Sequence, residues 1–401
     1  GRGALAANTT GTNNTAVGNQ ALDANTTGIR STAIGFNSLS ANNANANTAV
    51  GYEAARENTS AVNINAFGYL ALQANTTGNN NSAFGTEALD ANTTGIANTA
   101  FGYATLSANT TASYITCVGA LSGLYITGQR TTAIGYGAIQ GVSGQSTGEN
   151  NTAVGFETLK VNTTGHTNTA IGVGSLKTNS EGFRNTGVGL DSLRLNTTGY
   201  QNTAVGSFAL DQNTTAANNT AIGHSALNAN TTGIANVAVG ANALDANTTA
   251  SNNIAIGLSA ATNTTTGQQN IAIGTEALKA NITGIYNIAI GTQALEKNTV
   301  ASNVALDANT TGESIVAIGK DALGANTTGV SNVAVGKGAL ATATVANNNT
   351  AVGTHALNAS TTAVQNVAVG TFAADAITTG NDNAVLGTYA LGVCTTGTGN
   401  I

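Results

Sequence analysis

Residues 14–28 read NTAVGNQALDANTTG, and the repeat N-T-A-V/I-G-x-x-A-L-x-A-N-T-T-G recurs along nearly the whole chain. We take the glycine that closes A-V/I-G as an anchor. With Gly1 included, about 23 anchors follow one another, most of them 17 residues apart. The spacing lengthens between Gly135 and Gly155 and between Gly291 and Gly319. Internal repetition therefore decides the architecture.

The composition excludes several classes of protein. The 401 residues include 50 Gly but no Pro, Met or Trp, and only 7% are charged, whereas an ordinary globular enzyme has about 25% charged residues. A hydrophobic fraction of 41% argues against disorder. A net charge of -6 argues against a nucleic-acid partner, and without a long apolar run no membrane insertion is expected. Because the chain has no Met, we expect it to be a fragment of a longer fibre.

A repeat of 17 residues is too short for a helix pair or a propeller blade, but it suits one coil of a β-solenoid. We predict an all-β fold, a parallel β-solenoid of about 23 coils, with two short strands in each coil and turns at Asn-Thr-Thr-Gly and at the anchor. Residues 1–401 are expected to form a single repeat domain, with irregular coils near 119–155 and 291–319.

Alternation along the strand before each anchor suggests which residues share a face. The residue just before the anchor and the one two earlier are expected to face the interior, together with the Leu four residues after it. Between them stands a persistent Ala, which we interpret as a contact with another chain because a larger side chain would hold a second backbone off. The residues predicted to make this inter-chain contact are Ala16, Ala33, Ala49, Ala83, Ala100, Cys117, Ala255 and Ala272.

The strand sequences Asn253-Ile254-Ala255-Ile256-Gly257 and Asn270-Ile271-Ala272-Ile273-Gly274 resemble the head repeats of trimeric autotransporter adhesins. The whole repeat is even more similar to repeats of bacteriophage tail-fibre proteins and of related bacterial surface proteins. The resemblance covers essentially the entire chain. It implies a homotrimeric, extracellular, left-handed parallel β-roll that serves attachment.

An enzymatic function is the main alternative to a structural one, and the residues give it little support. The stretch Ile273-Gly274-Thr275-Glu276-Ala277 matches one hexapeptide of the left-handed β-helix acyltransferases, but those coils need about three such hexapeptides each. The histidines His166, His224 and His355 fall at different repeat positions, so neither a general base nor a metal site is indicated. We expect no enzyme activity, no cofactor and no metal site.

Other recurring residues have structural interpretations. An Asp five residues after the anchor is expected to be exposed and solubilising (Asp23, Asp90, Asp211, Asp245). Cys117 and Cys394 lie too many coils apart to pair within one solenoid, and both are expected to be small buried residues; alternatively, Cys117 lies near its copies in a trimer.

The Asn of Asn-Thr-Thr allows three interpretations. In stacked coils it would form a ladder of side-chain hydrogen bonds, which we favour. The same triplet is an N-glycosylation acceptor, and the paired Thr residues could form an ice-binding array. The Asn residues concerned are Asn25, Asn75, Asn92, Asn162, Asn196, Asn213, Asn230, Asn247, Asn281 and Asn326.

The residue just after the anchor is often aromatic in the first part of the chain. A row of exposed aromatics could recognise sugars on a host surface, or it could pack against a neighbouring chain. The members of this possible recognition band are Phe36, Tyr52, Tyr69, Tyr103, Tyr136 and Phe156.

Together these observations favour a structural and adhesive fibre, the shaft or head of a phage tail fibre or a bacterial surface adhesin. Its partners would be two further copies of itself and a host-surface glycan or protein receptor. The alternative is a self-assembling extracellular filament without a receptor, and an ice-binding solenoid is a less favoured third.

Overall fold

The computed structural model describes residues 1–297, 312, 314–319 and 321–401. The predicted fold class is confirmed: the chain is an all-β parallel β-solenoid of about 21 turns with a repeat of about 17 residues. It divides into two compact units, a first unit of Gly1–Gln201 and a second unit of Asn202–Ile401.

Every strand in the described residues is three residues long and ends just before an anchor glycine. In the first unit the strands are β1 (Thr15–Val17), β2 (Thr32–Ile34), β3 (Thr48–Val50), β4 (Asn65–Phe67), β5 (Ser82–Phe84), β6 (Thr99–Phe101), β7 (Thr116–Val118), β8 (Thr132–Ile134), β9 (Thr152–Val154), β10 (Thr169–Ile171) and β11 (Thr186–Val188). In the second unit they are β12 (Thr203–Val205), β13 (Thr220–Ile222), β14 (Val237–Val239), β15 (Ile254–Ile256), β16 (Ile271–Ile273), β17 (Ile288–Ile290), β18 (Val316–Ile318), β19 (Val333–Val335), β20 (Thr350–Val352), β21 (Val367–Val369) and β22 (Ala384–Leu386).

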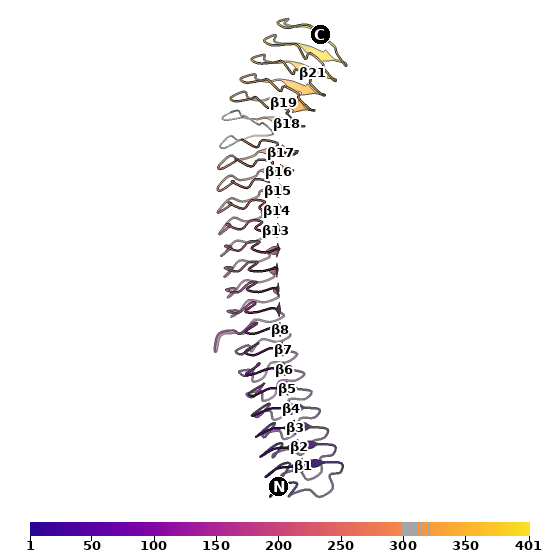
Figure 1. The fold of residues 1–401 in the computed structure, drawn as a ribbon, viewed down its shortest axis with the longest axis vertical. Helices are drawn as coiled ribbons and strands as arrows, with labels where there is room; N and C mark the ends of the chain where they lie inside the picture. The colour runs from indigo at the N-terminus through magenta and orange to yellow at the C-terminus, as the bar shows by residue number, and fades with distance from the viewer. Residues whose placement is uncertain (298–311, 313, 320) are drawn as a thin grey trace. The chain divides into compact units, whose positions relative to one another are not determined.

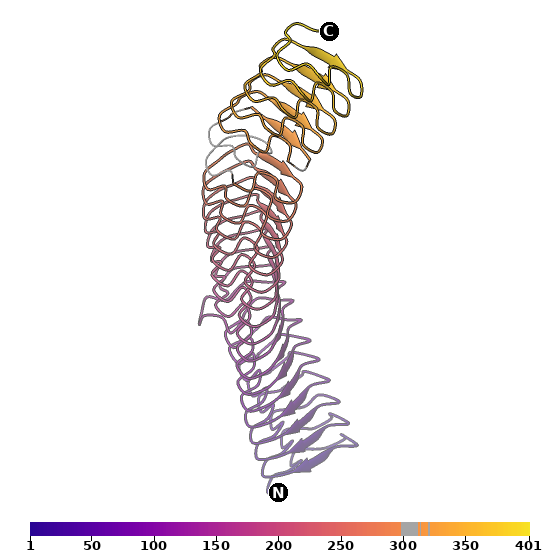
Figure 2. The same ribbon diagram turned by 45° about the horizontal axis from the view of Figure 1, so that its top comes forward.

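Within each unit, a strand pairs in parallel with the strand of the next coil, so that equivalent repeat positions stand side by side. Thr15, Ala16 and Val17 of β1 pair with Thr32, Ala33 and Ile34 of β2, and the pattern continues along the unit. Figures 1 and 2 show the strands of successive coils stacked in one row. A residue type that recurs in the repeat therefore becomes a continuous line on the surface or in the interior.

The predicted assignment of the two strand faces is wrong, and the structure reverses it. The middle residue of the strand points into the coil: Ala33, Ala49, Ala83, Ala100, Cys117, Ala255 and Ala272 are fully buried within their own chain, and Ala16 in β1 is half-buried. The residues on either side point outward, as shown by Phe101, which is 56% exposed. These alanines therefore cannot form the predicted contact with another chain.

The physical reason is the width of the coil. The Leu four residues after the anchor was correctly predicted to be in the core, and Leu22, Leu39, Leu72 and Leu89 are fully buried. In most coils this Leu takes up the space facing the strand, so the inward strand residue is small. Where the larger Cys117 is inward, the Leu position is Gly123, and a Cβ added there would meet the Cys117 sulfur. The larger Val, Ile and Phe residues of the strand are excluded and turn outward.

The predicted second strand is also wrong, because a turn segment takes its place. In the first unit Gln20 and Leu22 have φ values of 57° and 53°, in the left-handed region, and the equivalent residues of other coils repeat this. Because positive φ values alternate with negative ones here, successive backbone amides point toward opposite neighbouring coils. Gln20 N donates to Arg2 O (2.9 Å) of the preceding coil, and Leu22 N donates to Ser38 O (3.1 Å) of the next coil. The segment therefore bonds the coils together without being a strand.

The predicted asparagine ladder is confirmed. Asn92 Nδ2 donates to Asn75 Oδ1 (2.7 Å) of the preceding coil and to Gly95 O (3.0 Å) of its own turn. All ten predicted members are fully buried. Hydrogen bonding of this kind removes the cost of burying the amide and the turn carbonyl.

A second buried ladder was not predicted, although its Asn is plain in the repeat as the residue before the strand. Asn168 N donates to Asn151 Oδ1 (3.0 Å) of the preceding coil, and Asn168 Nδ2 donates to Gly182 O (2.8 Å) of the next turn. The two ladders lie on either side of the NTTG turn and hold its carbonyl groups.

One irregular coil lies within the described residues. After β8 the coil is 20 residues long, from Gly135 to Gly155, and Figures 1 and 2 show it projecting beyond its neighbours. An isolated parallel bridge joins Ile126 to Ser146, and a Cβ added at Gly144 would meet no other atom within 4 Å. Most of the other predicted irregular coil, near 291–319, lies outside the described residues.

The anchor glycine is required both by its backbone angle and by its surroundings. Gly85 has a φ of 142°, which only glycine adopts readily, and a Cβ there would collide with the carbonyl oxygen of Gly102 in the next coil. The sequence correctly indicated a close approach of another backbone at this glycine. The backbone is the next coil of the same chain, not a second chain.

Substituting the anchor should therefore destabilise the solenoid. We expect Gly85→Ala to lower the free energy of unfolding by roughly 2 kcal/mol or more, from backbone strain and the clash with Gly102 together. The matched control is Gly144→Ala, whose φ of 71° is also left-handed but where an added Cβ meets nothing. Thermal unfolding followed by circular dichroism checks this, and equal melting temperatures for the two variants would contradict it.

Candidate interaction surface

The outward side chains of the strands form what we call the sheet face. In the first unit each strand presents one polar residue, mostly Thr, and one aliphatic residue or Phe, as in Thr32 and Ile34 of β2. In the second unit β14–β17 present two aliphatic residues each. We call these eight residues the aliphatic face: Val237, Val239, Ile254, Ile256, Ile271, Ile273, Ile288 and Ile290.

The aliphatic face has no charged residue among its members and is open to solvent in the single chain. Ile256, Ile288 and Ile290 are 39%, 36% and 38% exposed. Side chains of this kind normally lie in a core, and a contiguous exposed apolar patch marks an interaction site in soluble proteins. The face is therefore a surface that another molecule can cover.

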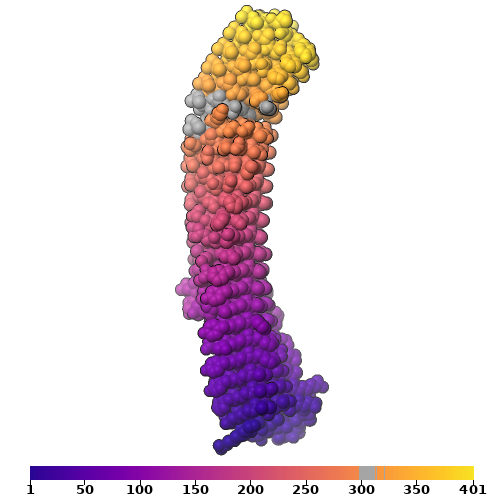
Figure 3. Space-filling view, in the orientation of Figure 1, coloured from indigo at the N-terminus to yellow at the C-terminus, as the bar shows by residue number. Residues whose placement is uncertain are grey.

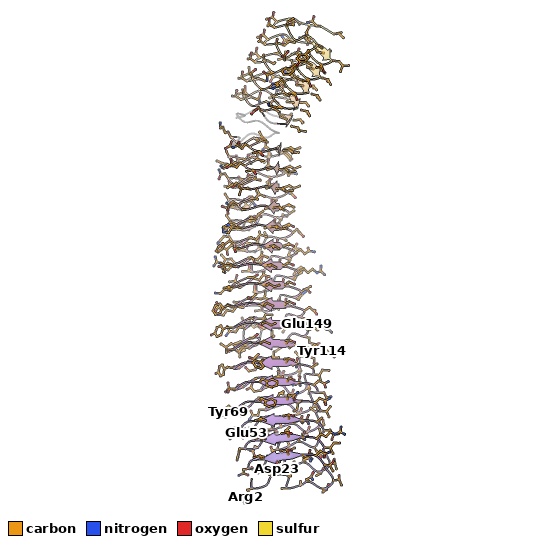
Figure 4. All side chains as sticks on the ribbon, turned by 45° about the vertical axis from the view of Figure 1, so that its right-hand side comes forward. Arg2, Asp23, Glu53, Tyr69, Tyr114 and Glu149 are labelled. Atoms are coloured by element: carbon orange, nitrogen blue, oxygen red, sulfur yellow. The ribbon has the colours of Figure 1, made fainter. Side chains whose placement is uncertain are left out.

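The predicted aromatic band lies in the first unit, where all six members are exposed in one row directly after the anchor glycines. We call it the aromatic row. Its exposed fractions run from 39% for Phe36 to 55% for Tyr103. Figure 4 shows Glu53 and Tyr69 on one side of the strands, and Tyr114 and Glu149 on the other. The row thus occupies one edge of the sheet face.

Many rings of the row stack on each other along the solenoid. The centroids of Phe36 and Tyr52 are 5.3 Å apart and those of Tyr52 and Tyr69 are 5.4 Å apart, with interplanar angles of 11° and 17°. Tyr136 and Phe156 form a third such pair at 5.5 Å. Tyr52 is therefore stacked on both faces, whereas a ring at the end of a stack, such as Tyr69, is covered by a ring on one face.

Sequence reasoning missed three further ladders of rings. On the sheet face, Phe67, Phe84 and Phe101 stack at 4.8 and 5.6 Å. The other two are His166, Phe183 and Tyr200 in the first unit and His355, Phe372 and Tyr389 in the second. The signal was present in the sequence, because members of one ladder occupy the same repeat position in successive coils. Two of the three histidines are therefore ring partners in stacks.

Charges lie beside these rows in small groups. Glu157 pairs with Lys177 of the next coil at 2.7 Å and with Lys160 of its own coil, and these hydrogen bonds lower the pKa of the Glu157 carboxyl. Because these side chains are partly open to solvent, such pairs add little to stability. For the first unit, Figure 3 shows one face on which successive coils lie in layers.

The recurring Asp is less exposed than predicted. Asp211 is buried, with 4% exposure, and Asp23, Asp90 and Asp245 are half-buried. Burial raises the pKa of Asp90 to about 6 and raises that of Asp245. Their position five residues after the anchor places them beside the buried Leu, which explains the partial burial.

Within the described residues no group of three or more His, Cys, Asp or Glu side chains is placed to hold a metal ion. In the same part of the chain no helix is long and apolar enough to cross a membrane. The prediction that the chain is not an enzyme stays a prediction.

The turn residues are engaged in bonds between coils. Each Asn of Asn-Thr-Thr is enclosed in its ladder, so the folded chain does not offer these ten amides for glycosylation. The first Thr also bonds onward, as Thr76 Oγ1 donates to Thr93 O (3.0 Å) and Thr93 Oγ1 to Thr110 O (3.0 Å). The turn therefore serves the stacking of the solenoid.

The two cysteines have different environments. Cys117 occupies the inward position of β7 and is fully buried, and burial raises the pKa of its thiol to about 12. It was correctly predicted to be buried, but it faces the interior of its own coil and cannot meet its copies in other chains. Cys394, which was also predicted to be buried, is free and only half-buried.

Comparison with protein-family models and with curated proteins found no match.

The cysteines give a direct test of the inward position. We expect a maleimide to modify Cys394 in the native protein while Cys117 stays unmodified until the chain is denatured, because a buried thiol with a raised pKa supplies almost no thiolate. Mass spectrometry of the peptides containing each cysteine checks this. Modification of Cys117 at a rate comparable with Cys394 would contradict the assigned interior.

Proposed function

We propose that the chain is a structural and adhesive fibre segment, part of a bacteriophage tail fibre or a bacterial surface adhesin that attaches to a host or another surface. In this proposal it works outside the cell, is not an enzyme and uses no cofactor. It binds no nucleic acid and does not insert into a membrane. Its partners are other copies of itself and a glycan or protein on the surface that it attaches to.

The observation that carries the proposal is the aliphatic face. A solenoid that acted alone would leave Ile254, Ile256, Ile271 and Ile273 partly in water along a row of strands, where much of their apolar surface stays unburied. A second copy is the occupant that we propose, because two solenoids with the same rise per coil match over any number of coils. Association would then bury the face along its length.

The number of copies in the proposal is three, as the repeat resemblance implies. Each copy would contribute its aliphatic face to the contact and keep its other sides in solvent. The aromatic row of the first unit is offset to one edge of the strands, next to Glu53 (Figure 4), which supports its use for a second partner.

Attachment by such a fibre is multivalent. Identical sites repeat along one chain and again on each copy, so weak individual contacts combine into a high overall affinity. Repetition of the same exposed groups in coil after coil supports this mode of action. The alternative, a filament without a receptor, shares the self-association but assigns no ligand to the aromatic row.

Self-association through the aliphatic face is tested by native mass. We expect the wild-type chain to have about three times the monomer mass of 39.4 kDa in light scattering. The double variant Ile256→Asp and Ile273→Asp should be monomeric, because it places two carboxylates on neighbouring strands of the face. Circular dichroism of both proteins checks that the solenoid is intact.

The matched control is the double variant Ile234→Asp and Ile282→Asp. These isoleucines belong to the same unit and are 46% and 44% exposed, but they lie outside the strands. The control should keep the wild-type mass. A monomeric wild-type chain at micromolar concentration, or loss of association in the control alone, would contradict the proposed contact.

A further inference from the structure

The aromatic row of the first unit is interrupted at two coils, which we call open rungs. Where the row would continue after Tyr69, the next coil has Thr86, and the coil after that has Tyr103. Backbone hydrogen bonds fix this order: Glu87 N donates to Tyr69 O (2.9 Å), and Ala104 N donates to Thr86 O (2.9 Å). Thr86 therefore stands directly between two tyrosines of the same row.

The second open rung is Ala120, between Tyr103 and Tyr136. Leu121 N donates to Tyr103 O (2.9 Å) and Gly137 N donates to Ala120 O (3.1 Å), which again places the three residues in consecutive coils. Tyr103 thus has a short side chain on both sides.

The Tyr103 ring differs from the stacked rings in its surroundings. Among the described residues no ring stacks on Tyr103, and at 55% it is the most exposed member of the row. One face of Tyr69 is covered by Tyr52, and its other face is directed toward the Thr86 rung. Two open ring faces therefore bound that rung.

The spacing suits one inserted ring. Two coils separate Tyr69 from Tyr103, which amounts to about 9.6 Å at the strand spacing of a sheet. A ring placed midway would lie about 4.8 Å from each tyrosine, within the range of stacked rings. The stacked pairs of the same row, at 5.3 to 5.5 Å, show that its side chains accept such distances.

The polar groups at the Thr86 rung distinguish it from the Ala120 rung. Thr86 is exposed and offers a hydroxyl group, and the neighbouring Glu87 offers a carboxylate that forms no ion pair within the described part of the chain. At the other rung the corresponding residues, Ala120 and Leu121, offer no polar side chain. A ligand at Thr86 should therefore combine a flat apolar face with a rim of hydroxyl groups.

We propose that the Thr86 rung binds a pyranose ring of a glycan, held between Tyr69 and Tyr103. The C–H faces of the sugar pack on the two rings, and its hydroxyl groups hydrogen-bond to the Thr86 hydroxyl and the Glu87 carboxylate. This inference rests on the proposed adhesive function and names the class of ligand for it. It also locates recognition at one rung of the aromatic row, since a ring face covered by another ring is closed to a sugar and the Ala120 rung offers no polar side chain.

The test uses saturation-transfer NMR with three probes, the methyl β-glycosides of glucose, galactose and N-acetylglucosamine, and with sorbitol as an open-chain control. We expect the wild-type chain to bind at least one glycoside and not sorbitol. Thr86→Tyr fills the rung and completes the stack, so it should weaken binding by roughly fivefold or more. Tyr103→Leu removes one wall and should weaken binding similarly.

The matched control is Ala120→Tyr, which adds the same side chain to the same row one rung further on. It should leave glycoside binding within about twofold of wild type. Equal binding by Thr86→Tyr and wild type, loss of binding in Ala120→Tyr, or absence of wild-type binding to all three glycosides would overturn the proposal. Melting temperatures of the variants show that each is folded.

The native mass of the same samples separates this inference from the proposed function. A chain that associates through the aliphatic face but binds no glycoside contradicts the sugar site and leaves the fibre proposal intact. A chain that neither associates nor binds contradicts both.

Discussion

The narrow interior of the coil is the constraint on which the rest of the structure depends. Coils stacked at the spacing of a sheet bond through their backbones, and most of them enclose one Leu opposite one small residue, such as Leu89 and Ala83. Large side chains such as Ile115 can also be buried elsewhere in a coil, but in the first unit the inward place on the strand takes only Ala, Cys or Gly. The Val, Ile and Phe residues that flank each inward Ala are consequently outside. What would be a core in a wider solenoid becomes the exposed apolar surface of this one.

Buried polar side chains supply hydrogen bonds in the interior that apolar residues could not supply. Carbonyl groups of the NTTG turn point into the chain, where water cannot reach them, and two rows of buried Asn donate hydrogen bonds to them in coil after coil. Asn92 bonds to its own turn at Gly95 and to the preceding Asn75, so each amide ties a turn to a neighbour. Asn recurs at these positions in most coils because its amide bonds buried carbonyl groups that an apolar side chain would leave without a partner.

Sequence reasoning recovered what depends on period and stacking. The coil length, the parallel architecture, the buried Leu, the Asn ladder and the placement of the aromatic row all follow from residues such as Leu22 and Tyr52 recurring at one repeat position. It failed on the direction of the strand faces, because alternation shows that Thr99 and Phe101 share a face but not which face is inside. Hydrophobicity favoured placing the larger strand residues in the interior. In the structure the buried Leu on the opposite side of the coil occupies that space. Stacking of the ring faces, which decides where a ligand can enter, also depends on side-chain orientation.

The inward direction of the middle strand residue is the central claim, and cysteine substitution along β6 tests it most directly. Three single variants, Thr99→Cys, Ala100→Cys and Phe101→Cys, are prepared in a chain whose own Cys394 is replaced by Ser. Each is treated with a soluble maleimide under native conditions. The structure predicts modification at positions 99 and 101 and protection at position 100, where the side chain is fully buried. Rapid modification at position 100 with protection of its two neighbours would contradict it.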